Sequence, residues 1–343
     1  MRAILPVAAV LVLAVFVGGY YAYWRIVARQ LEAGITAWAE KQRAFGNEVT
    51  FEWDGVGGFP FRFAATFREP VIRWHGSSAD AAWQGATLEA AMAPWNLRRI
   101  EVSSNGQNDA VLHLPGDPAE WRVAATGLAG TVTLHGDGAL RGFTLALKQP
   151  DLALAGAVLS SAAATVTLDQ PQAPPTDYNM PLGRVTLDAR GVALPPGTRL
   201  LTEDAIETLA LDATIKGPMP LAPPKEALAA WRDAGGVVEL SSFSLAQGPL
   251  GLTGNATLAL DADLQPEGAG TITSTGLGEA VEILISDGRI PGERALIART
   301  TVKALEKPGA DGKLHATLGL GLQNRVISFG PVPLIALQRI AWP

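Results

Sequence analysis

Short segments in which apolar and polar residues alternate recur along most of this chain, and this period of two limits the fold more than any other feature. It begins at residues 49–54 and returns at Thr131–Leu134, Phe143–Leu147, Thr165–Leu168, Val185–Arg190 and Thr208–Lys216. Successive side chains of a strand point to opposite faces, so each segment predicts a strand with one apolar and one polar face. Strands with one solvated face are typical of antiparallel sheets. We therefore predict a mainly β protein with a few helices, whose strands form an extended, mostly antiparallel β-groove or layered sheet.

The apolar faces of these strands are mainly aliphatic. Three faces show this clearly, and their members are Leu209, Leu211, Ala213 and Ile215, then Leu250, Leu252, Ala256, Leu258 and Leu260, then Leu314, Ala316, Leu318, Leu320 and Leu322. The 37 glycines and 24 prolines are scattered, which suits many short strands joined by turns.

One strand face is aromatic instead. Phe61, Phe63 and Phe67 alternate with other residues after a turn at residues 57–60. Such a face is either ordinary core or the lining of a groove for an apolar ligand. Core is the more common case, and Phe63 is the stronger core candidate. Phe67, close to the predicted strand end, is the better groove candidate, and all three residues are candidate lipid-facing positions.

Residues 3–24 contain no charged side chain. As a helix this segment rises roughly 33 Å, enough for a hydrocarbon core of about 30 Å. Bulky aromatic residues end it, which suits a retained anchor better than a cleaved signal peptide, since cleavage needs small residues. We therefore predict a transmembrane helix at 1–24, with membrane-interface residues Tyr20, Tyr21, Tyr23, Trp24 and Arg25.

The residues that follow predict an amphipathic helix at 25–46. One face carries Leu31, Ile35, Trp38, Gln42 and Phe45, and Gly46 marks its end. This face either packs on the first strands or lies in a membrane interface, and the weakly basic polar face favours packing. Further helices are predicted near 223–234 and 277–286, with a weaker candidate at 294–305.

A proline-rich segment at 171–181 divides the strand-rich region into comparable parts. We assign 47–170 to an N-terminal β-rich part, 171–181 to a linker, and 182–343 to a C-terminal β-rich part.

No residue pattern nominates an active site. The four histidines, His75, His113, His135 and His315, lack the spacing of metal ligands, and the common nucleophile and nucleotide-binding motifs are absent. The chain has no cysteine and a net charge of −6, which disfavours thiolate chemistry and nucleic-acid binding. We expect no enzymatic activity, no cofactor, no metal and no nucleic-acid partner.

The predicted anchor, the helix containing Trp38 and the segment Gly57-Gly58-Phe59-Pro60-Phe61-Arg62 resemble a bacterial family, domain of unknown function 2125. The strand–turn–strand at Val238–Leu260 and the closing strands from Gly312 to Pro333 resemble AsmA-type periplasmic proteins. That second resemblance implies an inner-membrane anchor and a β-groove in the periplasm. Larger relatives of this type are linked to lipid movement or outer-membrane integrity, and this chain is far shorter.

The orientation of the anchor is open from the residues alone. The arginines and lysine after the predicted span favour a cytoplasmic domain by the positive-inside rule, although a long C-terminal domain can cross despite such charges. The AsmA resemblance implies a single-pass inner-membrane protein with its bulk in the periplasm. We expect a non-catalytic envelope protein that binds or hands over lipid acyl chains in an apolar groove, its partner being membrane lipid. The alternative is a structural or adaptor protein that binds another envelope protein.

Overall fold

The computed structural model describes residues 4–76, 79–113, 120–154, 157–195, 205–220, 222–330, 332–340 and 342. Side chains are described in these ranges except at 4–12, 154, 224, 332, 334 and 335. The strands are β1 Glu48–Trp53, β2 Phe63–His75, β3 Asp80–Gly85, β4 Thr87–Ala93, β5 Asn96–His113, β6 Glu120–Leu134, β7 Leu140–Lys148, β8 Asp151–Leu154, β9 Ala157–Ser160, β10 Ala163–Asp169, β11 Pro181–Ala193, β12 Ala205–Lys216, β13 Val237–Gln247, β14 Leu250–Leu260, β15 Pro266–Thr275, β16 Lys307–Pro308, β17 Leu314–Gln323, β18 Val326–Phe329 and β19 Val332–Ala336. The helices are α1 Ile4–Ala44, α2 Pro224–Asp233, α3 Leu277–Ser286 and α4 Gly292–Leu305.

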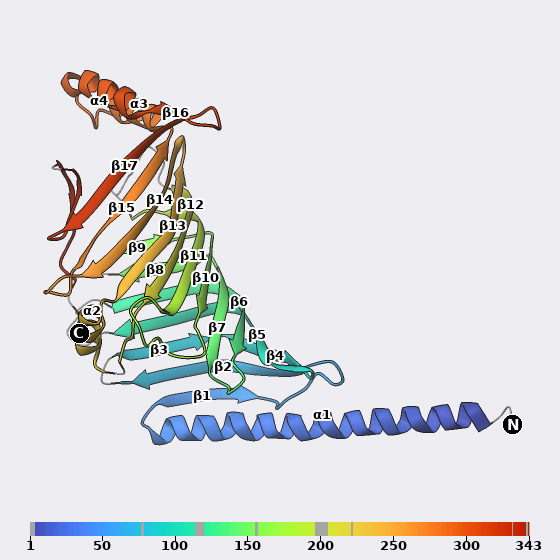
Figure 1. Cartoon of the computed structure of the whole chain (residues 1–343). Helices are drawn as coiled ribbons and strands as arrows, with labels where there is room; N and C mark the ends of the chain where they lie inside the picture. The colour runs from blue at the N-terminus through green and yellow to red at the C-terminus, as the bar shows by residue number, and fades with distance from the viewer. Residues whose placement is uncertain are drawn as a thin grey trace.

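The described strands form one 19-stranded sheet in which every pairing is antiparallel. Pairing runs from β1 to β2, through β4, β5, β6, β7, β10, β11, β12, β13, β14, β15 and β17 to β18 and β19. The sheet rises from α1 at one end to α3 and α4 at the other, and the strands turn from nearly parallel to α1 to steeply inclined (Figure 1). The predicted mainly β, antiparallel fold is confirmed, as one sheet and not stacked layers.

Helix α1 is continuous where the sequence suggested an anchor followed by a separate helix. Its buried side chains are Trp24, Ala28 and Ala39, with Leu31 and Ile35 partly buried between them. The predicted face was therefore wrong at two positions, because Trp38 is 41% and Phe45 69% exposed. Small Ala28 and Ala39 lie where the helix passes close to the strands, which turns the larger Trp38 and Phe45 toward solvent.

Polar side chains of α1 bind the first strand and the segment that follows it. Arg43 Nε donates to the Val49 carbonyl at 2.8 Å, and the Val56 backbone N–H donates to Glu32 Oε1 at 2.9 Å. Val49 itself is fully buried. The helix therefore covers the β1 end of the sheet (Figure 1).

Among the residues with described side chains, which begin at Leu13 in α1, no helix is both long enough and apolar enough to cross a membrane. The predicted anchor at 1–24 starts in residues 1–12, which lie outside that description.

The proline-rich segment 171–181 joins two neighbouring strands of the same sheet. β10 and β11 pair directly, from Ala163 opposite Arg190 to Asp169 opposite Arg184. The sheet therefore continues across the segment that the sequence suggested as a linker. Helix α2 lies within the predicted range 223–234, α3 matches 277–286, and α4 begins two residues before the weaker candidate at 294.

One face of the sheet is polar. A row of directly opposed residues on it consists of Glu101, Thr131, Thr144, Thr167, Thr186, Asp212 and Ser242. Arg184 donates to both carboxylate oxygens of Asp212, which lowers the pKa of Asp212 through that hydrogen bond and the adjacent positive charge. Threonines and ion pairs of this kind are compatible with water, so this face needs no covering layer.

The structure separates two phenylalanines that the sequence placed on one strand face. Phe63 is 2% exposed, whereas Phe61 is 73% exposed. We expect Phe63→Ala to lower the free energy of unfolding by about 3–5 kcal/mol through lost burial and a cavity. Phe61→Ala should change it by less than about 0.5 kcal/mol. Denaturant unfolding of both variants checks this, and equal losses would contradict the assignment.

The Arg184–Asp212 pair predicts a dependence of stability on pH. Because the pKa of Asp212 is lowered in the folded protein, its stabilisation is complete above the ordinary carboxyl pKa of about 3.9 and is lost as pH falls through the folded value. Between neutral and acid pH, the melting temperature of Asp212→Asn should therefore fall less than that of the parent protein. Asp188→Asn, which removes an exposed carboxyl of β11, is the control and should keep the parent profile.

Candidate functional site

The second face of the sheet is apolar along its whole length. A row of directly opposed residues, here called the apolar row, crosses the sheet from β2 to β18: Phe63, Met92, Ile100, Val132, Phe143, Leu168, Val185, Ala213, Leu240, Ala256, Gly270, Leu320 and Phe329. Directly opposed residues of paired strands point to the same side of a sheet. No member carries a charged or hydrogen-bonding side chain.

A second row of directly opposed residues lies beside the apolar row and also lacks charged and hydrogen-bonding side chains. Its members are Ala65, Ala90, Val102, Gly130, Leu145, Val166, Leu187, Leu211, Phe243, Gly254, Ile272 and Leu318. The two rows together form a strip that crosses the sheet perpendicular to its strands. We call this strip the apolar face.

The apolar face is largely open. Phe63 is buried beneath α1, but the members of the apolar row from Met92 to Leu320 are all only partly buried, and Phe329 is 38% exposed. An ordinary domain buries such side chains between two layers of secondary structure. Here the aliphatic side chains remain within reach of an apolar ligand.

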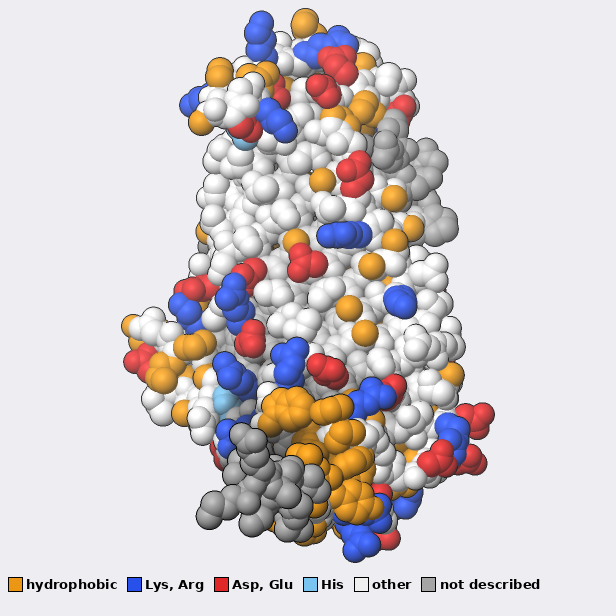
Figure 2. Space-filling view, turned by 90° about the vertical axis from the view of Figure 1, so that its right-hand side faces the viewer, with side chains coloured by type: hydrophobic (Ala, Val, Ile, Leu, Met, Phe, Trp, Pro, Cys, Tyr) orange, Lys and Arg blue, Asp and Glu red, His pale blue; other side chains and the backbone are white. Residues whose placement is uncertain are grey.

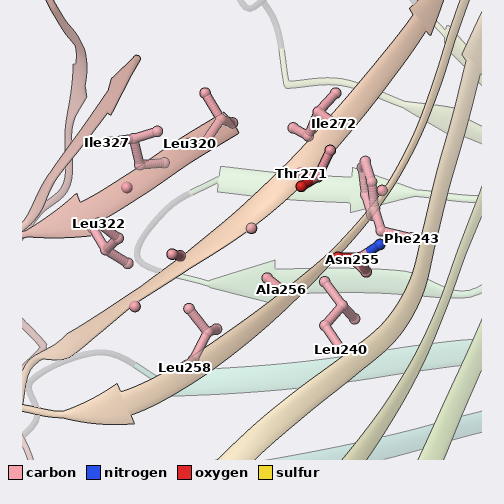
Figure 3. Close-up of a pocket in the computed structure, with 15 residues that line it drawn as sticks. Leu240, Phe243, Asn255, Ala256, Leu258, Thr271, Ile272, Leu320, Leu322 and Ile327 are labelled. Carbon is pink, nitrogen blue, oxygen red and sulfur yellow. The ribbon is translucent and has the colours of Figure 1, made fainter. Parts of the chain in front are cut away.

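The face is hollowed where β13, β14, β15, β17 and β18 meet. A cavity of about 230 Å³ lies there, and its apolar walls include Leu240, Phe243, Leu258, Ile272, Leu320, Leu322 and Ile327 (Figure 3). Asn255 and Thr271 are the polar side chains of the lining. Both alternate with members of the apolar face along their strands, so their main contribution to the apolar side is backbone.

Glycines form the floor of this hollow. Gly254, Gly268 and Gly270 lie opposite Ile272, Leu322 and Leu320, respectively. A Cβ at Gly270 would approach the Asn255 carbonyl oxygen to 2.4 Å, so no larger residue fits this backbone. The missing side chains leave a trough between the leucines of β13 and β14 and those of β17.

The three phenylalanines proposed as lipid-facing lie in three different environments. Phe63 stacks on Trp24 of α1 with ring centroids 5.2 Å apart, and Phe67 packs against Phe51 and Trp53 at 5.1 and 5.7 Å. Phe67 is partly buried and lies on the same side of β2 as Phe63, outside the two rows of the apolar face. Phe61 lies in the turn before β2 and outside the strand, so the expectation that it shares a strand face with the other two was wrong.

The predicted membrane-interface residues contact the folded domain. Tyr20 Oη donates to the Pro60 carbonyl, Tyr23 Oη donates to the Pro94 carbonyl at 2.9 Å, and Trp24 Nε1 donates to the Arg62 carbonyl at 3.2 Å. Tyr21 packs on Phe59 with ring centroids 5.3 Å apart, and Arg25 is exposed. The aromatic residues at the end of the predicted anchor thus also bind the segment 57–62.

The histidines make separate contacts, although His75 and His113 both lie opposite Asp80, on the strands either side of β3. His315 Nε2 lies 2.8 Å from Asp311 Oδ1, and this hydrogen bond lowers the pKa of Asp311. His113 Nε2 lies 3.6 Å from Glu120, and His135 Nε2 lies 3.2 Å from the Gln170 carbonyl. Across the described residues, no three histidine or carboxylate side chains are grouped as metal ligands would be.

The sequence reveals parts of this site but not its extent. The alternation in β12, β14 and β17 correctly separates apolar from polar residues. Phe243 and Ile272 were missed, because β13 contains an irregularity between Leu240 and Phe243 that breaks the period of two, and β15 has glycines where side chains would reveal the alternation. The spacing of three between Leu240 and Phe243 is the signal of a bulge that could have found this strand.

A comparison with protein families identifies the chain. The family described as "Uncharacterized protein conserved in bacteria (DUF2125)" matches residues 24–338, which include the segment 57–62, the apolar face and helices α2 to α4. A comparison with curated proteins gave no match. The chain belongs to the DUF2125 family of bacterial proteins.

Proposed function

We propose that this protein binds lipid acyl chains on its apolar face, as a non-catalytic protein of the bacterial cell envelope. The observation that carries the proposal is the unbroken apolar row, whose side chains stay partly exposed from Met92 to Leu320. In water such a strip is unfavourable, and covering it with hydrocarbon gains about 25 cal/mol per Å² of apolar surface removed from solvent.

The hollow has suitable dimensions for an alkyl chain. It spans β13 to β18, and neighbouring strands lie about 4.8 Å apart, so a ligand that crosses β13, β14, β15, β17 and β18 extends over roughly 19 Å. Each methylene group that is buried contributes about 0.8 kcal/mol. A long acyl chain therefore gains enough free energy to bind, even if it stays partly solvated on the open side.

The chemistry of the lining favours tails over polar ligands. The walls consist of leucine, isoleucine, phenylalanine and alanine side chains, with glycine beneath them. A polar group placed here would lose water without gaining hydrogen bonds, at a cost of several kcal/mol. The headgroup of a bound lipid accordingly stays outside the hollow.

We further propose that the N-terminal part of α1 anchors the protein in the inner membrane, with the sheet in the periplasm. In support of this, Leu13, Val15, Phe16 and Val17 are 55–74% exposed and continue the uncharged segment 3–12. The placement in the periplasm follows what the AsmA resemblance of residues 238–260 and 312–333 implies.

A second candidate function, an adaptor that binds another envelope protein, has one specific observation in its favour. Leu296 and Ile297 of α4 are 71% and 67% exposed, at the end of the sheet farthest from α1 (Figure 1). Adjacent exposed aliphatic residues on a terminal helix are typical of a protein-binding surface.

The proposal is tested by narrowing the hollow. Ala256→Phe should place a large ring among the apolar walls and weaken binding of a fluorescent long-chain fatty acid about tenfold, or about 1.4 kcal/mol. Thr257→Phe is the matched control, because Thr257 is the next residue of β14 and points to the polar face. It should bind like the parent.

Mass spectrometry of lipids that co-purify with the full chain provides an independent check. No bound lipid and no fatty-acid binding by the parent protein would contradict the proposal. If, in addition, the parent protein captured a specific envelope protein and Leu296→Asp abolished this capture, the adaptor function would replace acyl-chain binding as the proposed function.

A further inference from the structure

Two loops next to α1 carry the most exposed large aromatic side chains of the sheet. Phe61 precedes β2, Trp95 lies between β4 and β5, and each is 73% exposed. Both line one shallow hollow together with Arg62 and Arg99. Phe59, 43% exposed, lies in the same loop as Phe61 and packs on Tyr20, Tyr21 and Trp24 of α1. Contiguous exposed apolar side chains in a folded protein mark a surface that binds something.

Helix α1 holds both loops at the same level along its axis. The hydrogen bonds from Tyr20 to Pro60 and from Trp24 to Arg62 fix the first loop, and the bond from Tyr23 to Pro94 fixes the second. The three donors lie within a little more than one helical turn, about 6 Å of helix axis. The two loops that carry the exposed rings are therefore bonded to α1 at one level along its axis.

Immediately before this level, α1 leaves the domain with only apolar side chains exposed. Val15 and Phe16 are each 74% exposed, and no atom lies within 4 Å of a Cβ built at Gly18 or Gly19. Figure 2 views the molecule from this side and shows hydrophobic side chains gathered near its lower end, with basic and acidic side chains around them.

We propose that Phe59, Phe61 and Trp95 form an aromatic collar that seats the first strands of the sheet in the interface of a lipid bilayer. The composition identifies the occupant: aromatic rings at one level of an apolar helix, with arginines beside them, are typical of the headgroup region of membranes. Arg62 and Arg99 pair with Glu89 at 3.3 Å and Glu101 at 4.0 Å, and their side chains remain 61% and 55% exposed. The exposed parts of both arginines can still donate hydrogen bonds to lipid headgroups.

The proposed collar also bears on how a lipid would reach the apolar face. This link rests on the proposed lipid-binding function. Phe59 of the collar packs on Trp24, which in turn packs with Phe63 and Met92, the first two members of the apolar row. The apolar face thus begins at the level of the bilayer surface.

The absence of cysteine from the chain allows a direct experiment on the full-length protein. Phe61→Cys and Trp95→Cys, each labelled with the environment-sensitive fluorophore NBD, are reconstituted into vesicles of phosphatidylethanolamine and phosphatidylglycerol. Both labels should shift their emission to the blue, and lipids brominated near the glycerol backbone should quench them. Tyr178→Cys, 56% exposed in the β10–β11 connection, is the control and should keep the emission of a label in water.

Intrinsic fluorescence gives a second measurement without a label. Trp95→Phe should remove part of the tryptophan emission that brominated lipids quench, whereas Trp121→Phe on β6 should leave the quenched part unchanged. The collar would be overturned if labels at 61 and 95 behaved like the label at 178 in vesicles that carry the protein. It would be overturned equally if the blue shift appeared without lipid and grew with protein concentration, since the occupant would then be a second copy.

These outcomes are separate from those for the acyl-binding hollow. Loss of fatty-acid binding in Ala256→Phe concerns β14, far along the sheet from the collar. If the protein failed to float with vesicles, both the anchor and the collar would be wrong, while the hollow would still be judged by its own assay.

Discussion

The stacking of Trp24 on Phe63 joins the two parts of this molecule, a long helix and a very large open sheet. Phe63 is one of the few fully buried large side chains among the described residues, and Trp24 is 4% exposed. Large aromatic side chains bury much apolar surface, and the stacking geometry of the two rings adds to this stabilisation. Without this contact, the apolar face would be exposed to water at its first strands as well as along its middle.

Antiparallel register allows the apolar face to run uninterrupted through so many strands. A slip of one residue in any pair would turn all later apolar side chains to the other face. The bulge in β13 shows how this is avoided: Ser242 lies opposite Asp212 on the polar face, and Leu240 lies opposite Ala213 on the apolar face. Ser241 is the additional residue between them. The irregularity changes the local spacing in the sequence but keeps both faces consistent.

This arrangement explains how much of the fold could be predicted from the sequence. Where a strand alternates strictly, as in Leu209–Ile215, the fold class and the inward residues follow directly from the period of two. Where a glycine or a bulge interrupts the alternation, as at Gly268, Gly270 and Ser241, the pattern is lost although the strand persists. The order of the strands, and hence the joining of separate faces into one row, depends on pairings between segments that no local pattern specifies.

Helix α1 shows a different limit of what can be predicted from the sequence. Apolar spacing identified Leu31 and Ile35 as inward but placed Trp38 beside them instead of Ala39, because the two positions lie three and four residues after Ile35 and both fit a helical spacing. Close packing of a helix on a strand depends on shape, and a small residue permits an approach that a large one prevents. The aromatic residues near Trp24 were assigned to a membrane interface for their chemistry alone. Their hydroxyl and indole groups in fact reach the carbonyls of Pro60, Pro94 and Arg62, so the same residues fix the loops that carry the exposed rings. These contacts with the domain are compatible with the proposed membrane contact, because they use one side of the helix and leave the rings of the proposed collar exposed.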